Sequence, residues 1–177
     1  MMKILCLAFS LLVASALPAH AVTTIPATTG TALDGHAVSL PHDLTGRATI
    51  LIIGFTQHSQ DPTTAWEQPV RKTLAGPGIA YFDMPFLQDA PSLLRPLILR
   101  GIRKQVPDVL KPRFVPLITG EAAWKQTAGF TAAAPDAAYV LLVDSTGNIR
   151  WQTHEPYSPA LFEQLAQAAR AIAAETK

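Results

Sequence analysis

The stretch Ala48-Thr49-Ile50-Leu51-Ile52-Ile53-Gly54-Phe55 decides the fold class. It is a continuous run of apolar, mostly β-branched residues, which is typical of a strand covered on both faces. Similar runs follow at residues 79–84 and 139–144. The segments between them carry helix signals, with Pro62 and Gly76 marking one start and one stop. This alternation predicts an α/β sheet with helices on both faces.

The C-terminal part predicts a hairpin and a closing helix. Residues 145–148 form a turn, so the strand at 149–153 should pair back antiparallel to the strand before it. Ser158 and Pro159 are typical of a helix start, and the helix should run to about Ala173. Shorter extended segments are expected at 33–41 and 114–118. The prediction is a mostly parallel central sheet with an antiparallel C-terminal hairpin.

The N-terminus resembles a cleavable export signal. Lys3 precedes an apolar run over residues 4–17, and Ala19-His20-Ala21 has the small residues that signal peptidase requires. The run is too short to span a bilayer comfortably, so cleavage after Ala21 is favoured over a membrane anchor. We therefore predict a signal peptide (1–21), a flexible Thr/Ala-rich leader (22–32) and one domain (33–177). The protein should be periplasmic or secreted.

Cysteine content and charge limit the possible functions. The 177 residues include one cysteine, Cys6, which lies in the predicted signal peptide. Thiol–disulfide and peroxidatic chemistry both need a thiolate, so the processed chain should have neither activity. The chain has 14 basic and 13 acidic side chains. Loss of Lys3 leaves 13 of each, and this neutral balance argues against nucleic-acid binding.

Three local features, in this order, resemble the thioredoxin-like superfamily. They are the Leu33–Pro41 entry, the strand that ends in Gly54-Phe55-Thr56, and the Leu142–Trp151 hairpin. The resemblance implies a three-layer fold. Redox members carry a CxxC motif in the loop after the long strand, where this chain has Gln57-His58-Ser59-Gln60. Their cis-proline position corresponds to Ala138, before which we expect a trans peptide bond.

A narrower likeness is to the mitochondrial ATP synthase assembly-factor family, which has this fold without a dithiol. It is carried by Arg100, Arg103 and Val106-Pro107, and by the segment from Tyr139 to Trp151. The resemblance implies a chaperone or assembly role towards a membrane complex. It implies no cofactor.

The loop after the long strand is one candidate binding site. Asp61 is expected to cap the following helix, whose free N–H groups favour anions. Three interpretations remain open: a solvated loop, a pocket for a carboxylate or phosphate, and a nucleophilic Ser59 activated by His58. No catalytic residue and no metal site is predicted, because the histidines lack paired ligand spacing. The candidate binding residues here are Thr56, Gln57, His58, Ser59 and Asp61.

A basic segment over residues 95–113 is the second candidate. It has an excess of five positive charges, with Asp108 as its only acid. It could bind an acidic protein partner or contact the anionic head groups of a membrane, or it could simply be a solvated helix face. Arg150 and Trp151, on an expected edge strand, are further candidates if Trp151 faces outward. The basic residues are Arg95, Arg100, Arg103, Lys104, Lys111 and Arg113.

Together these features predict an exported, non-redox binding or assembly factor for a membrane-associated protein complex. The alternatives are a small-ligand binder or a non-thiol enzyme that uses the loop at 56–61.

Overall fold

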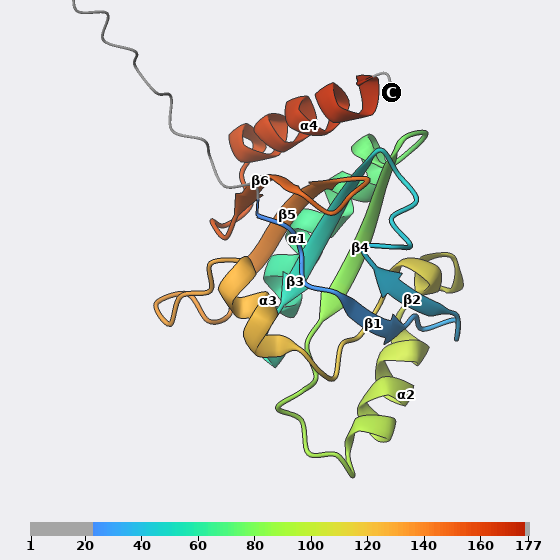
Figure 1. The fold of residues 1–177 in the computed structure, drawn as a ribbon. Helices are drawn as coiled ribbons and strands as arrows, with labels where there is room; N and C mark the ends of the chain where they lie inside the picture. The colour runs from blue at the N-terminus through green and yellow to red at the C-terminus, as the bar shows by residue number, and fades with distance from the viewer. Residues whose placement is uncertain (1–22, 176–177) are drawn as a thin grey trace, which may run out of the picture.

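Strand β3 (Ala48–Gly54) forms the middle of the protein, and each of its seven residues is buried. The computed structural model describes residues 23–175, so the predicted signal peptide lies outside the described residues. Beside β3 lie β4 (Ile79–Pro85) and β5 (Ala138–Asp144), and β6 (Ile149–Thr153) follows β5. The sheet order is β4-β3-β5-β6 (Figure 1).

The strand directions make this a mixed sheet. β3 and β4 are parallel, and parallel bridges join residues 114–117 to the other side of β4. β5 is antiparallel to β3, with Leu51 opposite Leu141, and β6 is antiparallel to β5. β5 therefore runs against the other strands. The predicted α/β sheet and its C-terminal hairpin are confirmed. The parallel part of the sheet is limited to β3, β4 and the bridges to residues 114–117, because β5 pairs antiparallel with β3, which the apolar runs do not encode.

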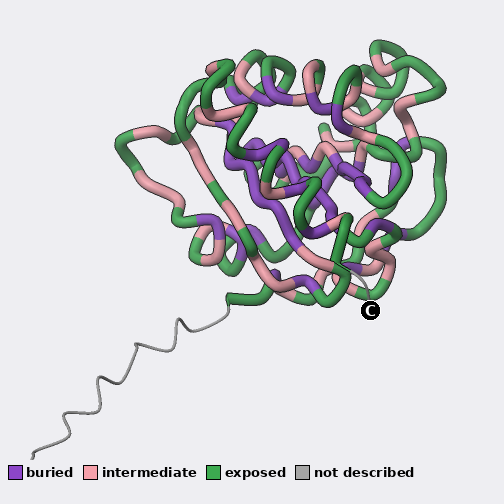
Figure 2. The backbone as a smooth tube through the Cα atoms, turned by 90° about the horizontal axis from the view of Figure 1, so that it is seen from above, coloured by how far each residue is buried: buried purple, intermediate pink, exposed green. Residues whose placement is uncertain are grey.

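Alternation along β3 builds two cores. Ile50 and Ile52 face α1 (Gln60–Pro69), the π-helical η2 (Val70–Leu74) and α4 (Pro159–Ala174). Leu51 and Ile53 face α3 (Glu121–Thr127) and a two-stranded hairpin. The sheet is thus the buried middle of three layers, as the backbone coloured by burial shows (Figure 2).

Residues 23–32 are ordered, so the prediction of a flexible leader is wrong for them. β1 (Thr28–Thr31) pairs antiparallel with β2 (Ala37–Leu40), and Ile25 is buried. The Thr28 hydroxyl accepts a 2.8 Å hydrogen bond from the Trp124 indole. Threonine is polar but β-branched, and its side chains alternate in and out along β1. Composition alone predicts a linker here, whereas in the structure alternate residues of β1 are half-buried.

The region after β4 is helical but contributes no buried residue to the core. α2 begins at Arg95, with Pro96 in its first turn, and ends at Gln105; η3 (Asp108–Arg113) follows. Leu94 and Leu97 are both exposed, and none of the residues of α2 or η3 is buried. α2 projects from the end of the molecule near the hairpin (Figure 1). Within residues 23–175, no helix combines the length and the apolar character needed to cross a membrane.

Candidate functional site

The loop at the carboxyl end of β3 is closed by its own hydrogen bonds. The backbone N–H of Thr56 donates to Ser59 Oγ at 3.3 Å, and the N–H of His58 donates to Thr56 Oγ1 at 3.2 Å. This capping box starts the one-turn helix η1 (Gln57–Ser59). Helical structure therefore begins at a Thr56 cap, and the predicted cap residue, Asp61, lies inside the first turn of α1.

Ser59 is only 1% exposed because it sits directly against β3. A Cβ added at Gly54 would lie 2.9 Å from the Ser59 Cβ, so the glycine makes this close approach possible. The buried hydroxyl bonds to Thr56, whereas the side chain of His58 is exposed. A nucleophile must be reachable by its substrate. The pair Ser59–His58 therefore does not have the geometry of a catalytic site.

Asp136 is a member of this site that sequence reasoning missed. The Thr56 hydroxyl donates to Asp136 Oδ1 at 2.5 Å, which ties the loop to the segment before β5. Within residues 23–175 the only cis peptide bond is Leu40–Pro41, so the bond before Ala138 is trans, as expected. The sequence signal for Asp136 is weak: an acidic residue in an Ala/Pro-rich stretch, 80 positions from its partner.

An aromatic cluster fills the space behind the loop. The ring of Phe55 stacks on Phe86 at 5.2 Å and meets Phe130 and Tyr139 edge-on. Lys125 Nζ lies 4.6 Å from the centre of the Phe130 ring, and its ammonium also pairs with a buried acid of α3, Glu121. Gln57, His58 and Asp61 are exposed in front of this block. The loop thus presents polar side chains on a rigid base.

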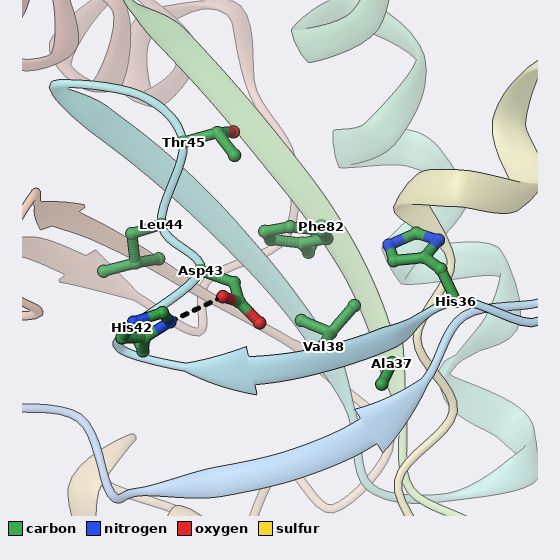
Figure 3. Close-up of a pocket in the computed structure, with 8 residues that line it drawn as sticks. All are labelled: His36, Ala37, Val38, His42, Asp43, Leu44, Thr45 and Phe82. Carbon is green, nitrogen blue, oxygen red and sulfur yellow. Dashed lines mark hydrogen bonds and ion pairs between the residues drawn. The ribbon is translucent and has the colours of Figure 1, made fainter.

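A shallow cleft of about 440 Å³ lies between β2 and β4. Figure 3 shows His36 and His42 at its two ends, with Phe82 behind. Each imidazole pairs with a neighbouring aspartate at 2.7 Å, and the hydrogen bond from His42 lowers the pKa of Asp43. In the part of the chain that the structure describes, no three His, Cys, Asp or Glu side chains converge as metal ligands. These are two surface ion pairs at the ends of an apolar cleft.

Some cations of the predicted basic segment have partners within the chain, and others are free to bind another molecule. Arg95 donates to the carbonyl oxygens of Gln88 and Ala90, at 2.6 and 2.9 Å. Arg103 Nε donates to the Leu33 carbonyl at 2.8 Å, which ties α2 to the hairpin. In η3, one cation, Lys111, pairs with Asp108 and another, Arg113, lies 5.1 Å from the centre of the Tyr81 ring. These four cations are engaged within the chain.

Arg100 and Lys104 remain, and both are exposed without an ion-pair partner among residues 23–175. Leu97 shares their helical face, because residues three, four and seven apart lie above one another on a helix. Leu93, in the turn just before α2, continues the row. Leu93 is 91% and Leu97 67% exposed. We call these four residues the outer face of α2.

The remaining candidates, Arg150 and Trp151, are both engaged within the chain. Arg150 pairs with Glu175 at 2.9 Å and with Asp144 at 3.5 Å. Trp151 is half-buried and meets the Trp66 ring at 6.3 Å. The indole therefore faces inward and the guanidinium outward. Trp151 was a candidate partner contact only if its ring faced outward, and it does not.

Comparison with known proteins supports the fold. No family model and no curated protein matches the chain. A thioredoxin-family thiol:disulfide interchange protein from Chlorobium tepidum TLS is similar at 17% identity and a TM-score of 0.54, covering 85% of this chain and 98% of its own.

Two further structures agree. BsSco, a member of the Sco family of cytochrome c oxidase assembly proteins, is 12% identical with a TM-score of 0.57, covering 88% of this chain and 96% of its own. The exposed lipoprotein thioredoxin of Streptococcus pneumoniae strain TIGR4 is 10% identical with a TM-score of 0.57, covering 80% and 98%. This chain has a thioredoxin-like fold without a cysteine in its described residues.

Proposed function

We propose that this protein is an exported, non-redox binding protein, and that the outer face of α2 docks on an acidic surface of a protein partner. The observation that carries the proposal is the exposure of Leu97, on a helix with no buried residue, and of Leu93, in the turn just before it. Covering one such leucine contributes about 1.5–3 kcal/mol, so an exposed pair is a candidate contact.

The charges on the same face specify the partner's character. Arg100 and Lys104 are not neutralised by ion pairs within the described chain, whereas Arg95 is bound through two of its nitrogens to backbone carbonyl oxygens and Arg103 is tied to the Leu33 carbonyl through Nε alone. An acidic surface would be attracted by the two available cations, and burial of the leucines would then stabilise the complex. A role in assembling a membrane-associated complex fits this surface. The name of BsSco, an assembly protein with the same fold, supports the choice.

The competing proposal, a small-ligand or enzymatic site at residues 56–61, has less support. Ser59 is buried against Gly54, and the Thr56 hydroxyl is already engaged by Asp136. Gln57, His58 and Asp61 remain available to a ligand, but an aromatic cluster closes the space behind them. The outer face of α2 offers both apolar area and unneutralised charge.

The test is quantitative capture of membrane-extract proteins by the purified protein and its variants. Leu93→Ser/Leu97→Ser and Arg100→Glu/Lys104→Glu should each reduce capture of the same stoichiometric partner by more than tenfold. The charge variant should also lose the salt dependence that the wild type shows. Arg103 is left intact, because its loss would release α2 from Leu33.

Two controls separate the outcomes. Lys72→Glu/Arg170→Glu makes the same change in net charge at exposed positions elsewhere and should leave capture unchanged. His58→Ala should also have little effect. If the His58 variant alone abolishes capture, the functional site is the loop. If the wild type floats with phosphatidylglycerol vesicles but captures no protein, the outer face binds a membrane and the protein-partner proposal fails.

A further inference from the structure

A second cleft, of about 430 Å³, lies on the inner side of α2. One wall is β1, with Thr29, Gly30 and Thr31, and the other is α2, with Leu99 and Arg103. Ile118, 47% exposed, lies with Pro116 along the cleft. Figure 1 shows α2 running beside the hairpin at this end of the molecule.

The wall formed by β1 is a strand edge that is open at Thr29 and Thr31 and ends at Leu33, whose N–H donates to the Phe114 carbonyl at 3.0 Å. The N–H of Ala32 donates to the His36 carbonyl, so Ala32 and His36 form a hydrogen-bonded pair. In an antiparallel ladder every second residue is hydrogen-bonded to the partner strand. Gly30 and Thr28 therefore pair with β2, while the N–H and C=O groups of Thr29 and Thr31 point to the other side. None of the backbone hydrogen bonds in residues 23–175 uses those four groups. An edge of this kind is a template for another strand.

The position of β1 is fixed by close packing. A Cβ added at Gly30 would lie 2.8 Å from Val115 Cγ1 and 3.0 Å from Leu117 Cδ2. The strand is thus pressed against residues 115–117 and cannot retreat into the core. A ligand would meet a preformed edge, which lowers the ordering cost of binding.

The opposite wall supplies apolar contact and one charge. Leu99 and Ile118 can cover apolar side chains. Arg103 uses its Nε on the Leu33 carbonyl, and the described residues provide no hydrogen-bond partner for its two terminal nitrogens. A guanidinium with donors to spare, next to an open strand edge, fits a carboxylate carried by an extended chain.

We propose that this cleft binds an extended peptide segment of a protein partner, which adds as a strand to the edge of β1 and places a carboxylate at Arg103. The backbone groups of Thr29 and Thr31 would supply the ladder, and alternate peptide side chains would pack on Leu99 and Ile118. The carboxylate could be the peptide's C-terminus or an acidic side chain. This inference rests on the proposed protein-binding function but uses a different surface from the outer face of α2.

The probe is a fluorescent library of random hexapeptides with free C-termini, screened by fluorescence polarisation beside an amidated copy of the library. We expect binders with alternating apolar residues and a carboxylate. Binders found only in the free-acid library would identify the C-terminus as the source of the carboxylate. Binders shared with the amidated copy would identify an acidic side chain.

Matched variants then test the geometry. Thr31→Pro removes the outward N–H and should weaken the best peptide by more than tenfold, whereas Thr31→Ala keeps that N–H and should stay within about threefold. Ile118→Asp should weaken binding about tenfold more than Ile118→Asn, because both lose the apolar contact but only aspartate repels the carboxylate. Thermal melts confirm folding of each variant.

Amide chemical-shift mapping with the best peptide decides the location. Shifts centred on Thr29, Thr31 and Arg103 support the proposal. Equal affinity of Thr31→Pro and Thr31→Ala, shifts confined to Leu97 and Arg100, or the absence of any binder would each overturn it. Partner capture by the outer face of α2 is tested separately, by Leu93→Ser/Leu97→Ser and Arg100→Glu/Lys104→Glu.

Discussion

Replacing Asp83 with Asn should change the pH dependence of stability. Asp83 lies on β4 opposite Ile52, on the face of the sheet that α1 covers. Burial, followed by the negative charge of Glu67, raises its pKa from the ordinary 3.8 to about 7. Glu67 is itself held by Arg71 at 2.7 Å and by the Tyr81 hydroxyl at 3.3 Å. No cation of the described residues forms an ion pair with Asp83.

The sign follows from proton linkage. The folded state binds the Asp83 proton more tightly than the unfolded state, so the free energy of unfolding falls as pH rises from about 4 to about 7. Each unit of pKa difference corresponds to about 1.4 kcal/mol, which gives an upper bound of about 4 kcal/mol above pH 7. Asp83→Asn removes this titration. The variant should match the wild type at pH 4 and be more stable at pH 8.

Urea unfolding at pH 4, 6, 7 and 8 measures the effect, and the fully buried Trp66 and Trp124 provide the fluorescence signal. Hydrogen bonds from His42 and Lys111 lower the pKa values of Asp43 and Asp108, so these two groups make the free energy of unfolding rise with pH. Their contribution is the same in the wild type and in Asp83→Asn, and it cancels when the two proteins are compared. Asp61→Asn, at an exposed position, is the matched control for the loss of one carboxylate. Identical pH slopes for the wild type and Asp83→Asn would refute the reasoning.

Three further predictions concern the core, the chemistry and the N-terminus. Ile52→Ala and Leu141→Ala, on adjacent strands with no exposed surface, should each cost about 2–5 kcal/mol in urea unfolding; losses below about 0.5 kcal/mol at both would contradict their placement. The processed protein should neither reduce insulin nor consume peroxide, since its chain from Val22 contains no thiol; catalytic turnover in either assay would disprove this. N-terminal sequencing of exported protein should begin at Val22, whereas an intact Met1 in a membrane fraction would indicate an anchor.

Some features of the protein follow from local sequence. The runs that became β3, β4 and β5 were identified because they are apolar and rich in β-branched residues. The Ser158 cap and the hairpin turn before β6 were also predictable, since capping and turn residues act over three or four positions. These signals establish the order of β3, α1, β4, β5, β6 and α4, whereas β1 was missed. The absence of a thiol from residues 7–177 is likewise a property of sequence alone.

Only the tertiary structure decided which surfaces are free. Periodicity places Leu97 and Ile102 on the same helix, but it cannot say which side has a neighbour: Ile102 is half-buried, whereas Leu97 is exposed. Equally, Arg100 and Arg103 look alike in sequence, yet one is free and the other binds the Leu33 carbonyl 70 residues away. Burial of Ser59 depends on its contact with Gly54, and the position of Thr56 on its bond to Asp136. Sequence fixes local propensity, whereas availability for binding depends on long-range contacts that only the folded chain brings together.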